Sequence, residues 1–185
     1  MNVKVVTLRK LIREGSRLLG VCQIVLNDVI IIDDIRIIEG PNGKFFAMPS
    51  QKIGEDYRDF AHSTNIETRR LLEGPIIGAY EGGIHEAGEL DEFVLTKIKV
   101  NYLPNATGPV ASVTIEFNNC MAFHSILIVK ELMPDGSSKF KFVMPNKEDG
   151  EGNRKPIYFF RTREFSDKVF GAIFDEYKKG LNKNN

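Results

Sequence analysis

The chain has 185 residues, and its 25 lysines and arginines balance 25 aspartates and glutamates, so its formal net charge is zero. A hydrophobic content of 42% and a charged content of 27% are typical of an ordinary globular domain. The neutral balance argues against nucleic-acid binding through bulk charge, but it allows a local basic face.

The first half begins with a series of predicted strands. Residues 3–11 and 18–26 are the first two, and the following Asn27-Asp28 pair favours the positive φ of a tight two-residue turn. A hairpin then runs from residue 27 to residue 50, because β-branched residues before a Pro-Asn-Gly turn are typical of paired strands. Pro49 cannot donate a backbone hydrogen bond, so the pairing is expected to end there.

An extended arm and a helix complete this half. Residues 57–62 (YRDFAH) are predicted to form a short strand or arm. Thr64 and Glu67 have the spacing of a capping box, which predicts a helix that begins near Ile66. We expect a kink or break at Gly74-Pro75, since an internal proline removes a hydrogen bond, and an end at Gly82-Gly83.

The second half repeats this order after a small, acidic segment at residues 84–92, which is interpreted as a linker. Asn118-Asn119 stands where the first half has its two-residue turn, and Met144-Pro145 stands where it has Met48-Pro49. A final helix is predicted over 166–179, capped by Ser166, with apolar residues recurring every four positions. The chain is therefore predicted to consist of unit 1 (1–83), a linker (84–92) and a diverged unit 2 (93–185).

The predicted fold class is α+β. Each of the two repeated units is expected to be a small, mostly antiparallel sheet with a C-terminal helix, and the units are expected to pack as a pseudo-dimer. Cys22 and Cys120 lie in apolar strands, which favours buried free thiols over a disulfide. The three histidines are far apart in sequence and no CxxC or HExxH occurs, so neither a metal nor another cofactor is expected.

The segment 32–52 (IDDIRIIEGPNGKFFAMPSQK), followed by YRDFAH and a helix ending in a tyrosine, resembles the SpoVG family (stage V sporulation protein G, septation protein). The resemblance covers residues 1–83 almost completely and residues 93–180 more weakly. Family members are homodimers of one such unit, so the resemblance implies that this chain is a fused dimer. It also implies that the protein is a nucleic-acid-binding regulator of bacterial septation, sporulation and gene expression, and that it is not an enzyme.

The sequence departs from the family pattern at several positions. Gln51-Lys52 stands where the family usually has Lys-Arg, so one cation is missing. In the second half Asn146 replaces the serine after Met-Pro, and the Arg-Asp pair is absent. The second half is therefore expected to have kept the fold while losing or changing the binding.

The candidate nucleic-acid-binding residues are mostly cations in or near the region of resemblance, and the same residue types on a solvated rim are the alternative interpretation. In unit 1 they are Lys44, Gln51, Lys52, Arg58, Arg69 and Arg70. In unit 2 they are Lys139, Lys141, Lys147, Arg154, Lys155, Arg161 and Arg163.

Two other sets of residues are interpreted as structural. Asp33-Asp34 and His124-Ser125 occupy equivalent repeat positions, but no nucleophile or phosphate loop accompanies them, so polar positions near the seam between the units are favoured over catalysis. Six phenylalanines at strand spacing are interpreted as core and not as a stacking platform for bases. These are Phe45, Phe46, Phe140, Phe142, Phe159 and Phe160.

The sequence thus predicts a cytoplasmic regulator that binds DNA or RNA, since no apolar run is long enough to span a membrane and no signal peptide is recognisable. The alternative is a protein-interaction module of the division or sporulation machinery that does not bind nucleic acid. The fusion of two units predicts a chain that can be monomeric in solution.

Overall fold

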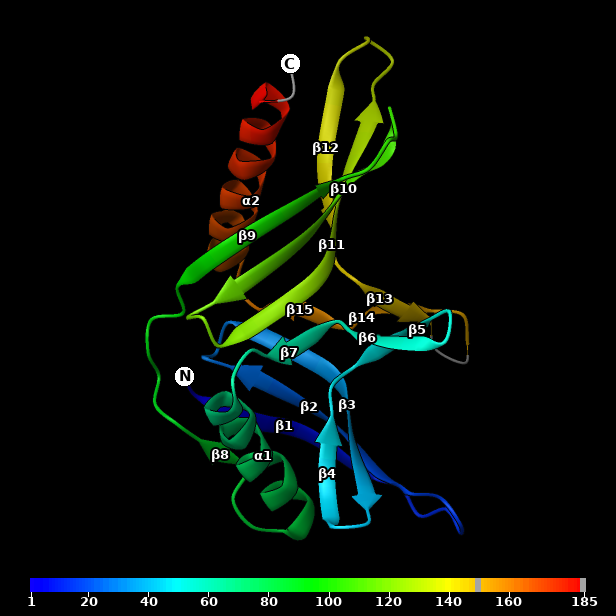
Figure 1. Ribbon diagram of the computed structural model, residues 1–185, viewed down its shortest axis with the longest axis vertical. Coiled ribbons are helices and arrows are strands. Elements are labelled where there is room, and N and C mark those ends of the chain that lie inside the picture. The colour runs from blue at the N-terminus through cyan, green and yellow to red at the C-terminus, as the bar shows by residue number, and fades with distance from the viewer. Residues whose placement is uncertain (149–150, 184–185) are drawn as a thin grey trace.

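Two antiparallel sheets, each accompanied by one helix, form the computed structural model, which describes residues 1–148 and 151–183 (Figure 1). The predicted α+β class, with a sheet and a C-terminal helix occurring twice, is confirmed. The last two residues of the predicted second unit lie outside the described residues. The proposed boundaries at residues 83 and 93 stay predictions.

The first half contains strands whose order matches the sequence pattern, with additional short strands after Pro49. Its elements are β1 (Val3–Lys10), β2 (Leu18–Leu26), β3 (Ile30–Gly40), β4 (Gly43–Ala47), β5 (Ser50–Ile53), β6 (Asp56–Asp59), β7 (Ala61–Ser63), α1 (Ile66–Glu81) and β8 (Glu86–Ala87).

The second half follows the same order from strand to helix. Its elements are β9 (Leu95–Tyr102), β10 (Gly108–Phe117), β11 (Met121–Leu132), β12 (Ser138–Val143), β13 (Asn146–Glu148), β14 (Arg154–Pro156), β15 (Tyr158–Phe160) and α2 (Arg163–Lys183).

The turn between the second and third strands of each half has the same backbone conformation. Asn27 and Asp28 have φ values of 45° and 57°, and Asn118 and Asn119 both have 50°. Left-handed backbone at both turn positions gives the mirror-image turn that matches the twist of a hairpin, and Asn and Asp tolerate it. The predicted turns are confirmed.

Each half also contains a β-bulge at an equivalent place. The pairing of β2 with β3 shifts register beside Asp33-Asp34, and the pairing of β10 with β11 shifts beside His124-Ser125. The second residue of each pair has a positive φ, 62° at Asp34 and 68° at Ser125. These two polar pairs thus mark where each long strand bends.

The two halves exchange strands. β7 pairs with β11 of the second sheet, and β15 pairs with β3 of the first. Matching backbone bonds flank both exchanges: His124 N–H donates to Phe60 O and Asp33 N–H donates to Ile157 O, each at 2.8 Å. The halves therefore form one interlocked body, and the segment predicted as a linker contributes a strand, β8, which pairs with β1.

The core is continuous between the halves and is rich in β-branched and aromatic side chains. Phe117 stacks on Phe93 and meets Phe123 edge-on, and Phe123 contacts the buried Tyr158 from the exchanged strand β15. The core interpretation holds for Phe46, which is buried, and for Phe140 and Phe142, whose rings contact α2. Phe160 also contacts α2 and Phe159 is half-buried, but the core interpretation is wrong for Phe45, which is 38% exposed. Cys22 and Cys120 are both free thiols, and the predicted burial is confirmed for Cys22 while Cys120 is half-buried.

Both helices begin at side-chain caps other than those predicted. The cap of α1 is Asn65, whose Oδ1 accepts from Thr68 N–H at 2.8 Å, while Thr64 instead donates its hydroxyl to Asn119 O. The cap of α2 is Thr162, whose Oγ1 accepts from Phe165 N–H, so this helix begins at Arg163 and not at Ser166.

Of the kink or break predicted in α1, the break is wrong, because the helix is continuous from Ile66 through Pro75 to Glu81, and the kink stays a prediction. Proline disfavours helical backbone at the preceding residue through a clash with that residue's Cβ, and Gly74 has no Cβ. Pro75 is itself buried, so its ring adds to the core. The expected end at Gly82 is confirmed by its left-handed φ of 85°.

Candidate nucleic-acid interface

The hairpin formed by β5 and β6 carries two of the predicted cations of the first half, Lys52 and Arg58, and both are exposed. Gly54, with a φ of 65°, forms its turn. In its register Gln51 faces Arg58, and Lys52 faces Tyr57. Cross-strand partners share a face of a hairpin, so an amide lies beside a guanidinium and an ammonium lies beside a phenol ring.

One side of this hairpin borders a polar hollow of about 470 Å³. Gln51 and Arg58 line it from the hairpin, and the outer face of the second sheet contributes side chains that are mainly amides, hydroxyls and imidazole: Asn101, Ser112, Thr114, His124 and Ser125. Two residues predicted from the first half thus meet polar groups of the second half, which no local sequence pattern indicates.

A second hollow, of about 650 Å³, lies between β4, β7 and the beginning of α1. Arg69 lies over the Phe46 ring at 4.7 Å and donates to Phe46 O at 3.4 Å, which orients the guanidinium. Asp59 and His62 line both hollows, so the two form one continuous surface. Burial raises the pKa of Asp59, although the positive charges of His62, Arg69 and Arg36 oppose this shift.

Two histidines 62 residues apart in sequence meet at this surface. His124 Nε2 lies 3.0 Å from His62 Nδ1, and the rings stack with centroids 5.0 Å apart. The second ring nitrogen of His124 lies 3.1 Å from Thr114 Oγ1. Burial, and then the neighbouring His62, lower the pKa of His124, so a neutral imidazole is favoured here.

The remaining first-half candidates lie away from the hollows. Lys44 forms an ion pair with Glu81 at 3.0 Å, and this hydrogen bond raises its pKa. Arg70 lies exposed on α1. The structure therefore brings together Gln51, Arg58 and Arg69 around the hollows, with Lys52 on the other face of the same hairpin. The other two predicted residues, Lys44 and Arg70, lie outside this surface.

Most second-half candidates are neutralised by nearby carboxylates. Lys147 pairs with Asp34 at 2.7 Å, Arg161 with Asp28 at 3.1 Å, Arg163 with Asp167 at 3.6 Å, and Lys141 with Glu131. Lys139 lies exposed on β12, and Arg154 and Lys155 lie exposed on β14. These residues are spread over a strand, a hairpin and a helix start instead of converging.

Sequence reasoning missed Tyr57 and the histidine pair. Tyr57 is 67% exposed, which is unusual for a tyrosine, and its position between acidic and basic residues of a short polar hairpin was the available signal. The contact between His62 and His124 depends on the exchanged strand β7, because Ala122 in β11 pairs directly with His62.

Residues 1–148 and 151–183 contain neither a metal-binding cluster of side chains nor a membrane-spanning helix. No group of three or more histidine, cysteine, aspartate or glutamate side chains is arranged to hold a metal ion within these ranges. Neither of the helices there combines the length and apolar character that crossing a membrane requires.

Comparison with known proteins places the first half in a defined family. The SpoVG family model matches residues 1–82. A putative septation protein SpoVG from Clostridioides difficile (strain 630) is 42% identical over 88 residues, which are 47% of this chain and 90% of the relative. Relatives of the same name from Phytoplasma australiense and Caldicellulosiruptor bescii are 46% identical over 82 residues and 41% identical over 90 residues.

These last two matches cover 44% and 48% of this chain and 84% and 100% of the respective relatives. Nearly whole relatives thus correspond to the strands and helix of the first half, including the β5–β6 hairpin. The chain belongs to the SpoVG family.

Proposed function

We propose that this protein is a nucleic-acid-binding regulator that uses the β5–β6 surface, defined as Gln51, Lys52, Tyr57, Arg58 and Arg69. The observation that carries the proposal is the contrast in pairing among the candidate cations. Lys52, Arg58 and Arg69 have no carboxylate within 4.0 Å in the described part of the chain, whereas five other candidates are ion-paired. An unpaired cation is available to a phosphate, and a paired one must first give up its carboxylate.

The chemistry of the surface suits a single strand or a loop. The three cations neutralise phosphates, and the exposed Tyr57 ring offers a face on which a base can stack. The amide of Gln51 lies at the polar hollow, where it can both donate to and accept from a base edge. The surface thus combines electrostatic attraction to the phosphate backbone of a nucleic acid with groups that can distinguish one base from another.

The proposed biological programme rests on the name of the relatives. These proteins are named putative septation proteins, and we propose that binding by the β5–β6 surface serves the control of septation. The second half, with most of its candidate cations paired, would serve mainly to hold the first half's surface in place. Its polar sheet face supplies the far wall of the hollow.

The test is a titration of the full chain with mixed single-stranded DNA and RNA pools at 50 and 200 mM salt. Each phosphate contact on a single strand contributes about −0.7 to the slope of log K against log salt, so three contacts predict a slope of roughly −2. A variant carrying alanine at Lys52, Arg58 and Arg69 should lose binding and the salt dependence with it.

The matched control removes three paired cations instead, one lysine and two arginines, through alanine at Lys44, Arg161 and Arg163. Both variants change the net charge by the same amount, so equal losses would mean that overall charge, and not this surface, attracts the nucleic acid. Absence of binding to either pool at 50 mM salt would also reject the proposal. A Tyr57→Ala variant should weaken binding without changing the slope, because it removes stacking and no charge.

A further inference from the structure

The outer edges of the two sheets differ at equivalent positions. In the first sheet β8 covers the edge of β1, where Val5 N–H donates to His85 O at 2.8 Å and Lys4 faces Glu86. In the second sheet the corresponding edge strand is β9, which pairs only with β10 among the described residues. The backbone groups on its other side are therefore free to pair with an added strand.

The ends of the helices explain this difference. Gly82 ends α1 in the left-handed conformation, and the chain then turns back across Gly78, where an added Cβ would lie 2.3 Å from Ile84 O. When the helix caps Asn65 and Thr162 are aligned, Lys179 takes the place of Gly82, and Asp175 takes the place of Gly78. Without a glycine at that position, α2 continues to Lys183, and within residues 1–148 and 151–183 no segment pairs with the outer edge of β9.

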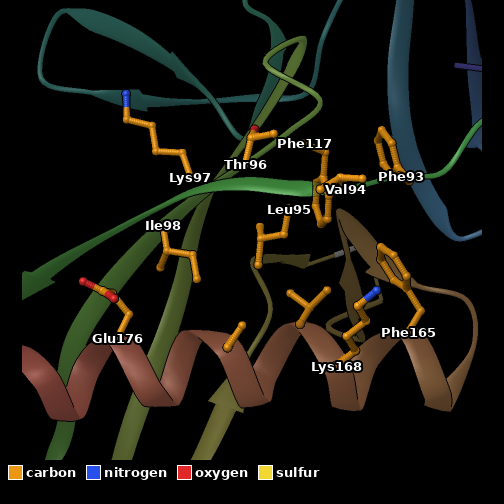
Figure 2. Close-up of a pocket in the computed structure, with 12 residues that line it drawn as sticks. Phe93, Val94, Leu95, Thr96, Lys97, Ile98, Phe117, Phe165, Lys168 and Glu176 are labelled. Carbon is orange, nitrogen blue, oxygen red and sulfur yellow. The ribbon is translucent and has the colours of Figure 1, made fainter.

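An apolar groove of about 600 Å³ lies between this open edge and α2 (Figure 2). Figure 2 shows Leu95 and Ile98 pointing from β9 toward the helix, with Phe165 at the far end of the groove. Phe93, Phe117, Val169 and Ala172 also line it. The groove therefore offers space for apolar side chains directly beside free backbone hydrogen-bonding groups.

The charges at the groove favour an acidic occupant. Lys97 and Lys4 occupy equivalent positions in the two sheets. Lys97 faces Glu116 and Lys4 faces Val25, and each of these partners stands two residues before the equivalent turn, at Asn118 and Asn27. Lys4 pairs with Glu86 of β8 at 3.3 Å, but Lys97 has no carboxylate within 4.0 Å in the parts of the chain that are described. Lys168 adds a second positive charge, and the one acid of the lining, Glu176, is held by Lys179 at 3.2 Å.

We propose that the edge of β9 binds an extended segment of a partner protein as an added strand, in the way that β8 covers β1. The segment carries an acidic residue opposite Lys97 and apolar residues on either side of it, which enter the groove against Leu95 and Ile98. Backbone pairing supplies affinity, and the alternating side chains supply specificity. No residue of this groove belongs to the β5–β6 surface, so the two proposals stand independently.

The probe is a fluorescein-labelled synthetic peptide that copies residues 83–91 with leucine in place of both His85 and Ala87, so that the acid corresponding to Glu86 has an apolar residue on either side. Its binding to the full chain is followed by fluorescence anisotropy. Lys97→Glu should weaken binding at least tenfold, and Ala172→Phe, which fills the groove, should abolish it. Lys139→Glu on β12 makes the same charge change at the opposite edge of the sheet and should leave binding unchanged.

A second peptide, N-methylated at the two introduced leucines, keeps every side chain but cannot pair as a strand, and it should not bind. Equal binding of the two peptides would overturn the proposal, as would equal effects of Lys97→Glu and Lys139→Glu. Sedimentation tests a different occupant: a dimer of the chain that Ala172→Phe disperses would assign the groove to a second copy and would also overturn the proposal. The N-methyl and Lys97 tests remain decisive if Ala172→Phe fails to fold.

Discussion

At the scale of single residues, the contact between His124 and His62 couples stability to pH. Burial and His62 lower the pKa of His124 below its ordinary value of 6.5 in the folded chain. The unfolded chain therefore takes up the proton first, and protonation favours unfolding. We expect a constant contribution to the free energy of unfolding above pH 7, and a decline as the pH falls through 6.5 toward the lowered pKa.

Urea unfolding at pH 7.5 and pH 5.5 measures this decline. His124→Asn removes the titrating ring and should reduce the difference in stability between the two pH values. The control is His85→Asn, which changes an exposed histidine in the segment before β8. An unchanged difference in the His124 variant would show that another group is responsible for the pH dependence.

At the scale of elements, Gly→Ala changes at the end of α1 and inside α2, where an added Cβ meets no neighbouring atom at either position, should have opposite effects on stability. Gly82 ends α1 at a φ of 85°, and an added Cβ would have nothing within 4 Å, so Gly82→Ala costs only the left-handed backbone, about 1 kcal/mol. Gly171 lies exposed inside α2, also with open space around it, so Gly171→Ala should stabilise by roughly 1 kcal/mol. Thermal and urea unfolding of both variants checks the signs, and two changes of the same sign would contradict the explanation.

Local chemistry made most elements of this fold predictable from sequence. The Asn27-Asp28 and Asn118-Asn119 turns could be predicted because few residue types adopt left-handed backbone. The continuation of α1 through Gly74-Pro75 was missed. A Cβ at position 74 would clash with the proline ring, and the prediction did not consider that glycine has none. The choice of Asn65 over Thr64 as cap was also missed, because Asn119 O, from the other half, accepts the threonine hydroxyl.

The candidate interface was only partly predictable for the same reason. Gln51, Lys52 and Arg58 lie on one local hairpin, and they could be predicted because they belong to the region that resembles the family. The hollow beside them is completed by Ser112, Thr114 and His124, and these reach it only because the two halves interlock. Which cations are paired also depends on contacts between halves, as in Lys147 with Asp34 and Arg161 with Asp28.

At the scale of the whole molecule, exchanged strands should make the halves inseparable under native conditions. Tyr158 in β15 is fully buried, and its hydroxyl donates to His124 O at 2.7 Å. The same strand pairs with β3 of the first sheet, so one tyrosine joins elements from both halves. Separating the halves would expose this ring and break backbone bonds at both β7 and β15.

A protease site inserted between Glu89 and Leu90, both exposed, tests this interlocking. After cleavage we expect the two fragments to elute together in size-exclusion chromatography at the position of the intact 20.9 kDa chain. Tyr158→Ala should reduce the stability of the complex by about 3–5 kcal/mol, as for other large buried aromatic rings, and should release the fragments at lower urea. The exposed Tyr57→Ala should change it by less than about 0.5 kcal/mol. If the cleaved fragments elute separately without any substitution, the exchanged strands do not hold the halves together. This result would contradict the interlocking of the two halves.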